Sequence, residues 1–263
     1  MMSMTNYFVE GLQGSGKTTL AGKLAKKHPD HRALAEGDYS PVELSWCAYM
    51  TRAEHQRALE TFPFLREEIQ RSSHAEGDHV VVCYTKVRTD CQDFYRTLEG
   101  YEIYNNRVSL DDFKRIILTR YRNWQEDGLI VECSLFQNIV EDLILFRCLE
   151  DAEILAFYRE LREAVGKKDI HIAYIRTEPD DIGINLEKAR RERTDDQGNE
   201  VWFSMLCGYF NECPYATKNG LKDAEGLIRH WQHRQALELE ICETLFPGQY
   251  TVFPSKAYGE VDI

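Results

Sequence analysis

Short apolar segments alternate along this chain with longer segments in which apolar residues recur every three or four positions. The first pattern is typical of buried strands, and the second predicts helices with one apolar face. We expect core strands at residues 7–9, 32–36, 129–134, 170–175 and 249–253. Strands that alternate with helices predict an α/β fold, a three-layer α/β/α sandwich with a parallel sheet.

The segment 41–128 separates the second and third of these strands, and its pattern is mainly helical. We expect a helix at 43–50, one that ends near 61–62, one from Pro63 towards Ser73, and a β-like run at 79–84. Ser109 and Asp112 resemble a capping box at the start of a further helix. The apolar stripe of that helix predicts core residues rather than a ligand site: Leu110, Phe113, Ile117, Tyr121 and Trp124.

The remaining helices are expected at 18–27, after residue 135, at 155–165, at 184–194 and at 223–246, whereas 202–220 has an irregular pattern. The first of them ends before Pro29, because proline terminates helices. No segment is a convincing linker, so we expect one domain over residues 1–263, with 41–128 as a helical insertion.

Composition narrows the classes of protein that fit. The chain has 263 residues, 43% of them hydrophobic, which indicates a packed core. Its formal charge of −12 argues against binding along a nucleic-acid backbone. The absence of a long apolar run argues against a membrane span, and we expect a cytoplasmic protein without a signal peptide.

The eight cysteines of the chain form no C-x-x-C pair and are interpreted as buried free thiols. The oligomeric state is open, and a homodimer is compatible with the sequence.

The most specific motif lies between the first strand and the first helix, where Gly11 is followed after four residues by Gly16, Lys17 and Thr18. This spacing fits the phosphate-binding loop, in which glycines let successive backbone N–H groups surround an anion at a helix N-terminus. The alternative is a tight strand-to-helix turn with a chance lysine. The predicted nucleotide-binding residues are Gly11, Gly14, Ser15, Gly16, Lys17, Thr18 and Thr19.

A bound ATP would need Mg²⁺, and two oxygen ligands are predicted for it. The Thr18 hydroxyl is one, and the carboxylate of Glu132, at the end of a core strand, is the other. The alternative for Glu132 is an ordinary ion pair at a strand end. Lys17 would contact the β- and γ-phosphates as a catalytic cation.

Acids after the second strand are the candidates for the general base and for binding the acceptor. Asp38 is the first candidate and Glu36 the second, since we expect their strand beside the strand that leads into the phosphate-binding loop. The alternative is that Glu36, Gly37 and Asp38 form a polar turn.

Cations for the transferred phosphate are predicted in a lid region, 184–220. Arg190 and Arg193 lie on one helix face, and a loop-like segment follows them. The alternative is a solvated charged face. His230 and His233 are interpreted as surface histidines, and Cys207 with Cys213 lacks the further ligands of a metal site.

Together these residues resemble a known family. Residues 10–19, EGLQGSGKTT, look like the opening of P-loop nucleoside and nucleotide kinases, including thymidylate kinases. The basic helix at 188–193 resembles their lid. Residues 131–134 are similar to the acid-Arg-Ser signature of deoxynucleoside kinases, with Cys133 where those kinases carry arginine. Residues 36–38 are closer to small-molecule kinases of the shikimate, gluconate and chloramphenicol phosphotransferase type, in which such an acid meets the acceptor hydroxyl.

The resemblance implies a P-loop NTPase fold and an ATP- and Mg²⁺-dependent kinase. Its partner would be a small-molecule phosphate acceptor, with a nucleoside or nucleotide as the leading class. Two alternatives stay open: a kinase of another metabolite or antibiotic hydroxyl, and an NTP-hydrolysing switch.

Overall fold

The predicted core strands form a five-strand parallel sheet in the computed structural model, which describes residues 4–256, 259 and 263. The order across the sheet is β2-β6-β1-β7-β8, so the strand that leads into the glycine loop lies in the middle. The prediction of an α/β fold with a parallel sheet is confirmed. The five strands are β1 (Asn6–Gly11), β2 (Arg32–Leu34), β6 (Leu129–Glu132), β7 (Ile170–Arg176) and β8 (Tyr250–Pro254).

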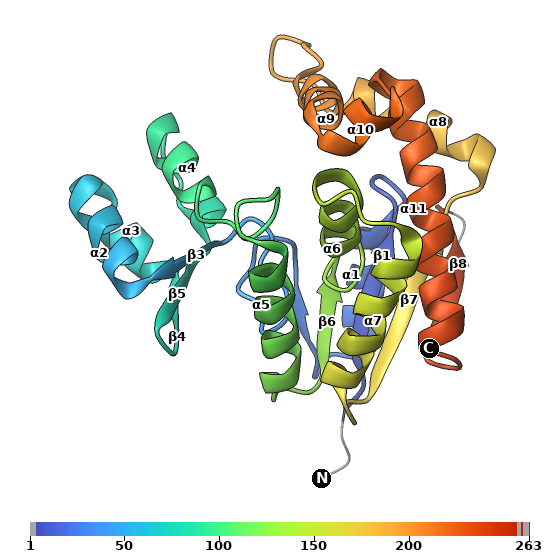
Figure 1. The fold of residues 1–263 in the computed structure, drawn as a ribbon, viewed down its shortest axis with the longest axis horizontal. Coiled ribbons are helices and arrows are strands. Elements are labelled where there is room, and N and C mark those ends of the chain that lie inside the picture. The colour runs from blue at the N-terminus through green and yellow to red at the C-terminus, as the bar shows by residue number, and fades with distance from the viewer. Residues whose placement is uncertain (1–3, 257–258, 260–262) are drawn as a thin grey trace. The chain divides into compact units, whose positions relative to one another are not determined.

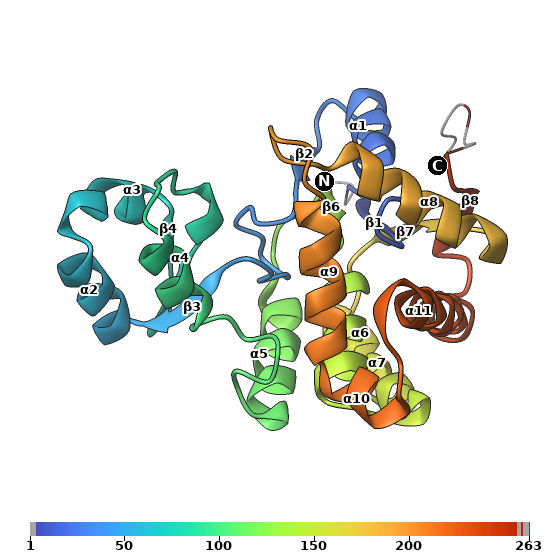
Figure 2. The same ribbon diagram turned by 90° about the horizontal axis from the view of Figure 1, so that it is seen from above.

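Helices cover both faces of this sheet, which is compatible with a three-layer sandwich (Figure 2). Successive side chains of a strand point to opposite faces. Tyr7 and Val9 of β1 therefore pack with Leu20 and Leu24 of α1 (Lys17–Lys27) on one face. On the other face, the Tyr174 hydroxyl of β7 donates a hydrogen bond to Glu238 of α11 (Asp223–Leu245).

The later helices agree with the predicted pattern except in one segment. Residues 202–220 were expected to be irregular, and this is wrong, because α9 and α10 occupy them. Pro214 opens α10 in the first turn, where its missing N–H costs nothing, and Gly220 ends it in a left-handed conformation. Among the described residues, no helix is long and apolar enough to cross a bilayer. The helices are α6 (Gln137–Glu141), a π-helical turn (Asp142–Phe146), α7 (Asp151–Val165), α8 (Pro179–Glu192), α9 (Val201–Glu212), α10 (Pro214–Asn219) and α11 (Asp223–Leu245).

The chain divides into two compact units (Figure 1). The core unit contains the parallel sheet and comprises the residues up to 33 and from 127 onward. The inserted unit comprises Leu34–Glu126, close to the insertion predicted at 41–128.

The inserted unit contains an antiparallel sheet that its mainly helical pattern did not reveal. Three short strands pair in the order β3-β5-β4. The helix predicted at 43–50 is wrong, because residues 48–51 form β3 and pair with β5. The elements are β3 (Ala48–Thr51), α2 (Arg52–Thr61), a 3₁₀ turn (Pro63–Leu65), α3 (Arg66–Arg71), β4 (Ser73–Glu76), β5 (His79–Val82), a second 3₁₀ turn (Tyr84–Lys86), α4 (Gln92–Glu99) and α5 (Leu110–Asn123).

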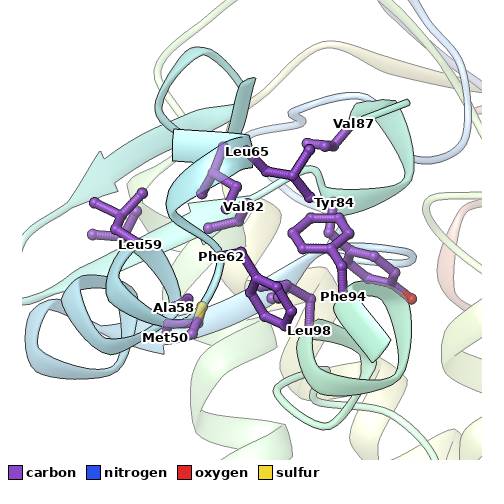
Figure 3. Packing of buried hydrophobic residues seen from close by; sticks show 13 residues of the cluster. Met50, Ala58, Leu59, Phe62, Leu65, Val82, Tyr84, Val87, Phe94 and Leu98 are labelled. Atoms are coloured by element: carbon purple, nitrogen blue, oxygen red, sulfur yellow. The ribbon is translucent and has the colours of Figure 1, made fainter. Parts of the chain in front are cut away.

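The inserted unit has its own hydrophobic core, shown in Figure 3. Met50 of β3 and Val82 of β5 meet side chains from α2 and α4 there. Phe62 and Phe94 pack edge to face with ring centroids 5.5 Å apart, an arrangement that aromatic rings prefer. A separate core allows this segment to be compact in its own right.

Helix α5 confirms the predicted start and the predicted stripe. The Ser109 hydroxyl accepts the backbone N–H of Asp112 at 3.1 Å and caps the helix. Phe113, Ile117 and Tyr121 are buried, and so is Trp124 at its end. These four residues of the predicted stripe are core, whereas Leu110 is only partly buried.

We predict that Ser109→Ala lowers the free energy of unfolding by about 1 kcal/mol, because it leaves an N–H of the first turn of α5 without its acceptor. Urea unfolding of the full chain would measure this. Ser109→Asn supplies another cap and should stay within about 0.5 kcal/mol of the wild type. Equal losses in both variants would show that the cap is not the cause.

Candidate functional site

The glycine loop connects β1 to α1 and depends on three glycines in the left-handed region of backbone space. Their φ angles are 139° at Gly11, 76° at Gly14 and 110° at Gly16. A Cβ on Gly11 would lie 2.5 Å from the Ile175 carbonyl oxygen, so β7 leaves no room for a side chain there. The loop conformation therefore requires glycine at these positions.

The loop ends at the N-terminus of α1, where backbone donors gather. Gly16 is the N-cap and supplies no side-chain cap. The Leu20 N–H closes the first turn on the Gly16 carbonyl oxygen. The N–H groups that precede Leu20 in the helix have no acceptor within it, and the helix dipole adds positive potential. A Cβ on Gly14 would meet no described atom within 4 Å, so this part of the loop is open. The geometry suits an anion.

The Lys17 side chain lies along the loop and is buried. Its ammonium group donates hydrogen bonds to the carbonyl oxygens of Gly11 at 3.0 Å and Leu12 at 2.9 Å. These bonds place the positive charge at the loop, where a phosphate would compete for it.

The two predicted metal ligands are in direct contact. Glu132 is opposite Val9 in the register of β6 with β1, and Val9 packs against α1. The Glu132 side chain therefore points to the α1 face, where its Oε1 accepts the Thr18 hydroxyl at 2.8 Å. A hydroxyl and a carboxylate are hard oxygen donors, and Mg²⁺ takes few protein ligands alongside phosphate and water oxygens. The pair fits Mg²⁺, although the described residues hold no cluster of three or more metal-ligating side chains.

A second acid, Glu10, directly follows Val9 in β1, and its side chain points to the sheet face opposite that of Glu132. It is fully buried and accepts the backbone N–H groups of Leu135 at 2.6 Å and Gln137 at 3.2 Å. Burial outweighs these hydrogen bonds and raises its pKa to about 8. Glu10 thus joins the end of β1 to the start of α6.

Glu141 of α6 contacts the glycine loop from this side. It accepts the Gln13 side-chain amide at 2.9 Å and forms an ion pair with Arg234 of α11. Burial opposes the charge of Glu141, but the guanidinium and His230 outweigh it and lower the pKa to about 2. The loop side chain of Gln13 is therefore held by an ionised carboxylate.

Arg234 has no exposed surface, and its partners surround it. Its Nε lies 3.1 Å from Glu238 Oε1, and another nitrogen donates to the Gly11 carbonyl oxygen at 3.4 Å. Glu238 in turn accepts the Tyr174 hydroxyl at 2.6 Å. The guanidinium thereby connects α11 with α6, with β7 and with the first residue of the loop.

One of the two histidines of α11 differs from its predicted surface position. His230 is completely buried, and its Nε2 lies 3.8 Å from Glu141 Oε1, so the surface prediction is wrong for this residue. Burial lowers its pKa. His233 is partly exposed and pairs with Asp151 at 2.8 Å. The error arose because one polar face of α11, with His230, Arg234 and Glu238, faces the core, while Gln232 faces solvent.

The acids predicted for the acceptor occur in a turn of the inserted unit. β2 ends at Leu34, and β6 separates it from β1, so the expectation that β2 adjoins β1 is wrong. Asp38 closes the turn, since its Oδ2 accepts the Ala35 N–H at 2.8 Å, and its Oδ1 pairs with Lys86 at 2.7 Å. Glu36 is half-buried in the same turn.

The predicted lid arginines lie at the end of α8 in the core unit. The Arg190 Nε donates to Glu200 at 2.7 Å, and its guanidinium lies 4.7 Å from the Phe203 ring centroid. The Arg193 guanidinium lies 4.6 Å from the Trp202 ring centroid. Both cations therefore contact the start of α9, across the turn at 194–199.

The sequence alone suggested no role for the buried polar residues that lie between the glycine loop, α6 and α11, namely Glu10, Glu141, Arg234 and Glu238. A signal for them does exist, since His230, Arg234 and Glu238 recur every fourth position on one face of α11. Glu10, a charged residue inside an apolar strand, is a similar signal, because such residues are rarely buried without partners.

Neither a protein-family model nor a curated protein sequence matches this chain.

We predict that Glu10 makes the protein less stable as the pH rises. Its pKa is higher in the folded protein, about 8, than the ordinary 4.5, so its contribution is complete below pH 4.5 and is lost as the pH rises towards 8. Urea unfolding between pH 5 and 8 should show a smaller decline for Glu10→Gln, which stays neutral. An unchanged pH dependence in this variant would contradict the assignment.

Proposed function

We propose that the chain is an ATP- and Mg²⁺-dependent kinase that transfers the γ-phosphate to a small acceptor, with a nucleoside or nucleotide as the leading class. Three features of the core unit support this: the strained glycine loop, the open helix N-terminus and the lysine held at the loop. Each is a requirement for holding a polyphosphate.

The observation that carries the proposal is the 2.8 Å contact between Thr18 and Glu132. A chance turn between a strand and a helix has no reason to place a hydroxyl from the helix against an acid from the neighbouring strand. A magnesium-dependent nucleotide site would use such a pair. Thr18 and Glu132 would hold the ion, which neutralises charge on the β- and γ-phosphates when it is bound.

The remaining residues have distinct proposed roles. Backbone N–H groups of the loop and of the first turn of α1 bind the phosphates, which requires the Ser15 N–H to leave its 3.2 Å hydrogen bond to the Leu12 carbonyl oxygen. Lys17 exchanges its carbonyl partners for phosphate oxygens. Arg190 and Arg193 supply cations from the lid, which requires them to leave their present contacts on α9. Asp38 or Glu36 binds the acceptor hydroxyl and accepts its proton.

Two other functions use the same loop. A kinase of another metabolite or of an antibiotic hydroxyl differs only in the acceptor. An NTP-hydrolysing switch differs in the reaction, because it transfers phosphate to water. The roles proposed for the lid arginines and for Asp38 and Glu36 belong to a kinase, since a switch would need neither.

We predict that ADP release from ATP depends on an added acceptor, because a kinase site excludes water from the γ-phosphate. The assay would screen nucleosides, nucleotides and sugar-like alcohols. Lys17→Ala should abolish turnover without unfolding the protein. Lys26 is an exposed lysine of the same helix, and Lys26→Ala should leave turnover unchanged. Acceptor-independent turnover by the wild type would favour the switch, and full turnover by Lys17→Ala would refute both readings.

We also predict that Thr18→Val and Glu132→Gln each raise the Mg²⁺ concentration for half-maximal turnover by at least about tenfold, since each removes an oxygen ligand or its charge. A magnesium titration at saturating ATP would measure this, with Lys26→Ala as the control. Wild-type magnesium dependence in Glu132→Gln would assign the contact with Thr18 to structure alone.

A further inference from the structure

Two cysteines of the inserted unit lie opposite each other at the end of a pair of strands. β3 and β5 are antiparallel with Ala48 opposite Val82, and the same register places Cys47 opposite Cys83. Their sulfur atoms are 3.7 Å apart, and the residues are 1% and 3% exposed. Directly opposite residues have Cβ atoms about 5 Å apart. An S–S bond is about 2.05 Å long, so the two sulfur atoms would approach by about 1.7 Å to form a disulfide.

The environment distinguishes the two thiols. The Cys47 thiol donates a hydrogen bond to the Cys83 sulfur. This bond lowers the pKa of Cys83 against the effect of burial, and the charges of Lys86 and Arg120 lower it further, while Asp38 opposes them. The same bond and burial raise the pKa of Cys47. Because the thiolate is the nucleophile, this asymmetry favours Cys83 as the attacking sulfur and Cys47 as the resolving one.

The pair is directly connected to the turn that contains Asp38. Cys83 precedes the 3₁₀ turn Tyr84–Lys86, and Lys86 forms the 2.7 Å ion pair with Asp38. A Cβ on Gly37 would lie 3.1 Å from the Thr85 hydroxyl and 3.7 Å from the Cβ of Trp46, the residue before Cys47. Side chains of residues next to both cysteines, Trp46 and Thr85, therefore lie close to the Gly37–Asp38 turn. Tyr84 and Val82, beside Cys83, belong to the core of this unit (Figure 3).

We propose that Cys47 and Cys83 are an oxidation site, at which hydrogen peroxide closes a disulfide that restrains the Asp38 turn. The Cys83 thiolate attacks one peroxide oxygen and breaks the O–O bond, giving a sulfenic acid and hydroxide, which takes up a proton to become water. The Cys47 sulfur then attacks the sulfenic sulfur, the S–O bond breaks, and the Cys47 proton leaves with the oxygen in a second water. Two thiols are oxidised and one peroxide is reduced. An effect on catalysis rests on the proposed function, but the disulfide itself does not.

Peroxide treatment of the full-length native protein tests the chemistry. After alkylation of the remaining thiols, peptide mass spectrometry should find a 47–83 cross-link that dithiothreitol reverses. Cys83 should react at least about tenfold faster than the buried Cys242, since each unit of pKa changes the thiolate fraction about tenfold. In Cys47→Ser, dimedone should trap a sulfenic acid on Cys83 and no cross-link should form.

The absence of a 47–83 cross-link in the wild type, or oxidation of Cys83 no faster than that of Cys242, would overturn the proposal. Hydrogen exchange before and after oxidation tests the link to Asp38. Exchange should slow in residues 35–47 and stay unchanged in the glycine loop at 11–19. A cross-link without this protection would overturn the connection to Asp38. Neither readout uses ATP turnover, so a failure of the kinase proposal would be distinguishable from a failure of the oxidation proposal.

Discussion

The buried guanidinium of Arg234 is the interaction on which the core unit depends. It has no exposed surface, and it pairs with Glu141 and Glu238 while also donating to the Gly11 carbonyl oxygen. Removing one member of such a buried ion pair typically costs about 3–5 kcal/mol, because the other charge loses its compensation. The elements that these four residues belong to are therefore held together by charge as well as by apolar packing.

This network gives the glycine loop a fixed side and an open side. On the fixed side, Glu141 holds Gln13, and Arg234 contacts the carbonyl group of Gly11. On the open side, a Cβ on Gly14 would meet no described atom within 4 Å, and Gly16 supplies no side-chain cap to the N-terminus of α1. Donors that are already positioned need no reorganisation when charge arrives, which is the property that makes such sites effective.

Part of the fold and of the candidate site could be predicted from the sequence, and the rest could not, for physical reasons. The glycine spacing and the apolar runs predicted β1, α1 and β6, and the strand-end rule placed Glu132 where it meets Thr18. The local pattern predicts a helix at 43–50, because the pairing of β3 with β5 is a contact between distant segments that this pattern does not report. The sequence also predicts an exposed His230, since a polar run on a helix usually faces water and only the ion-pair partners of this residue reveal its burial.

Glu10 and Glu132 show how one pair of strand ends can prepare two carboxylates for different tasks. They lie one register step apart on neighbouring strands, so the pleat sends them to opposite faces. Cys133 follows Glu132 with a φ of 60° and turns the chain, which brings the N–H groups of Leu135 and Gln137 onto Glu10. Glu10 is thereby buried with a raised pKa, while Glu132 stays half-exposed beside a hydroxyl. Burial therefore makes Glu10 a structural acid, whereas Glu132 stays available to a cation.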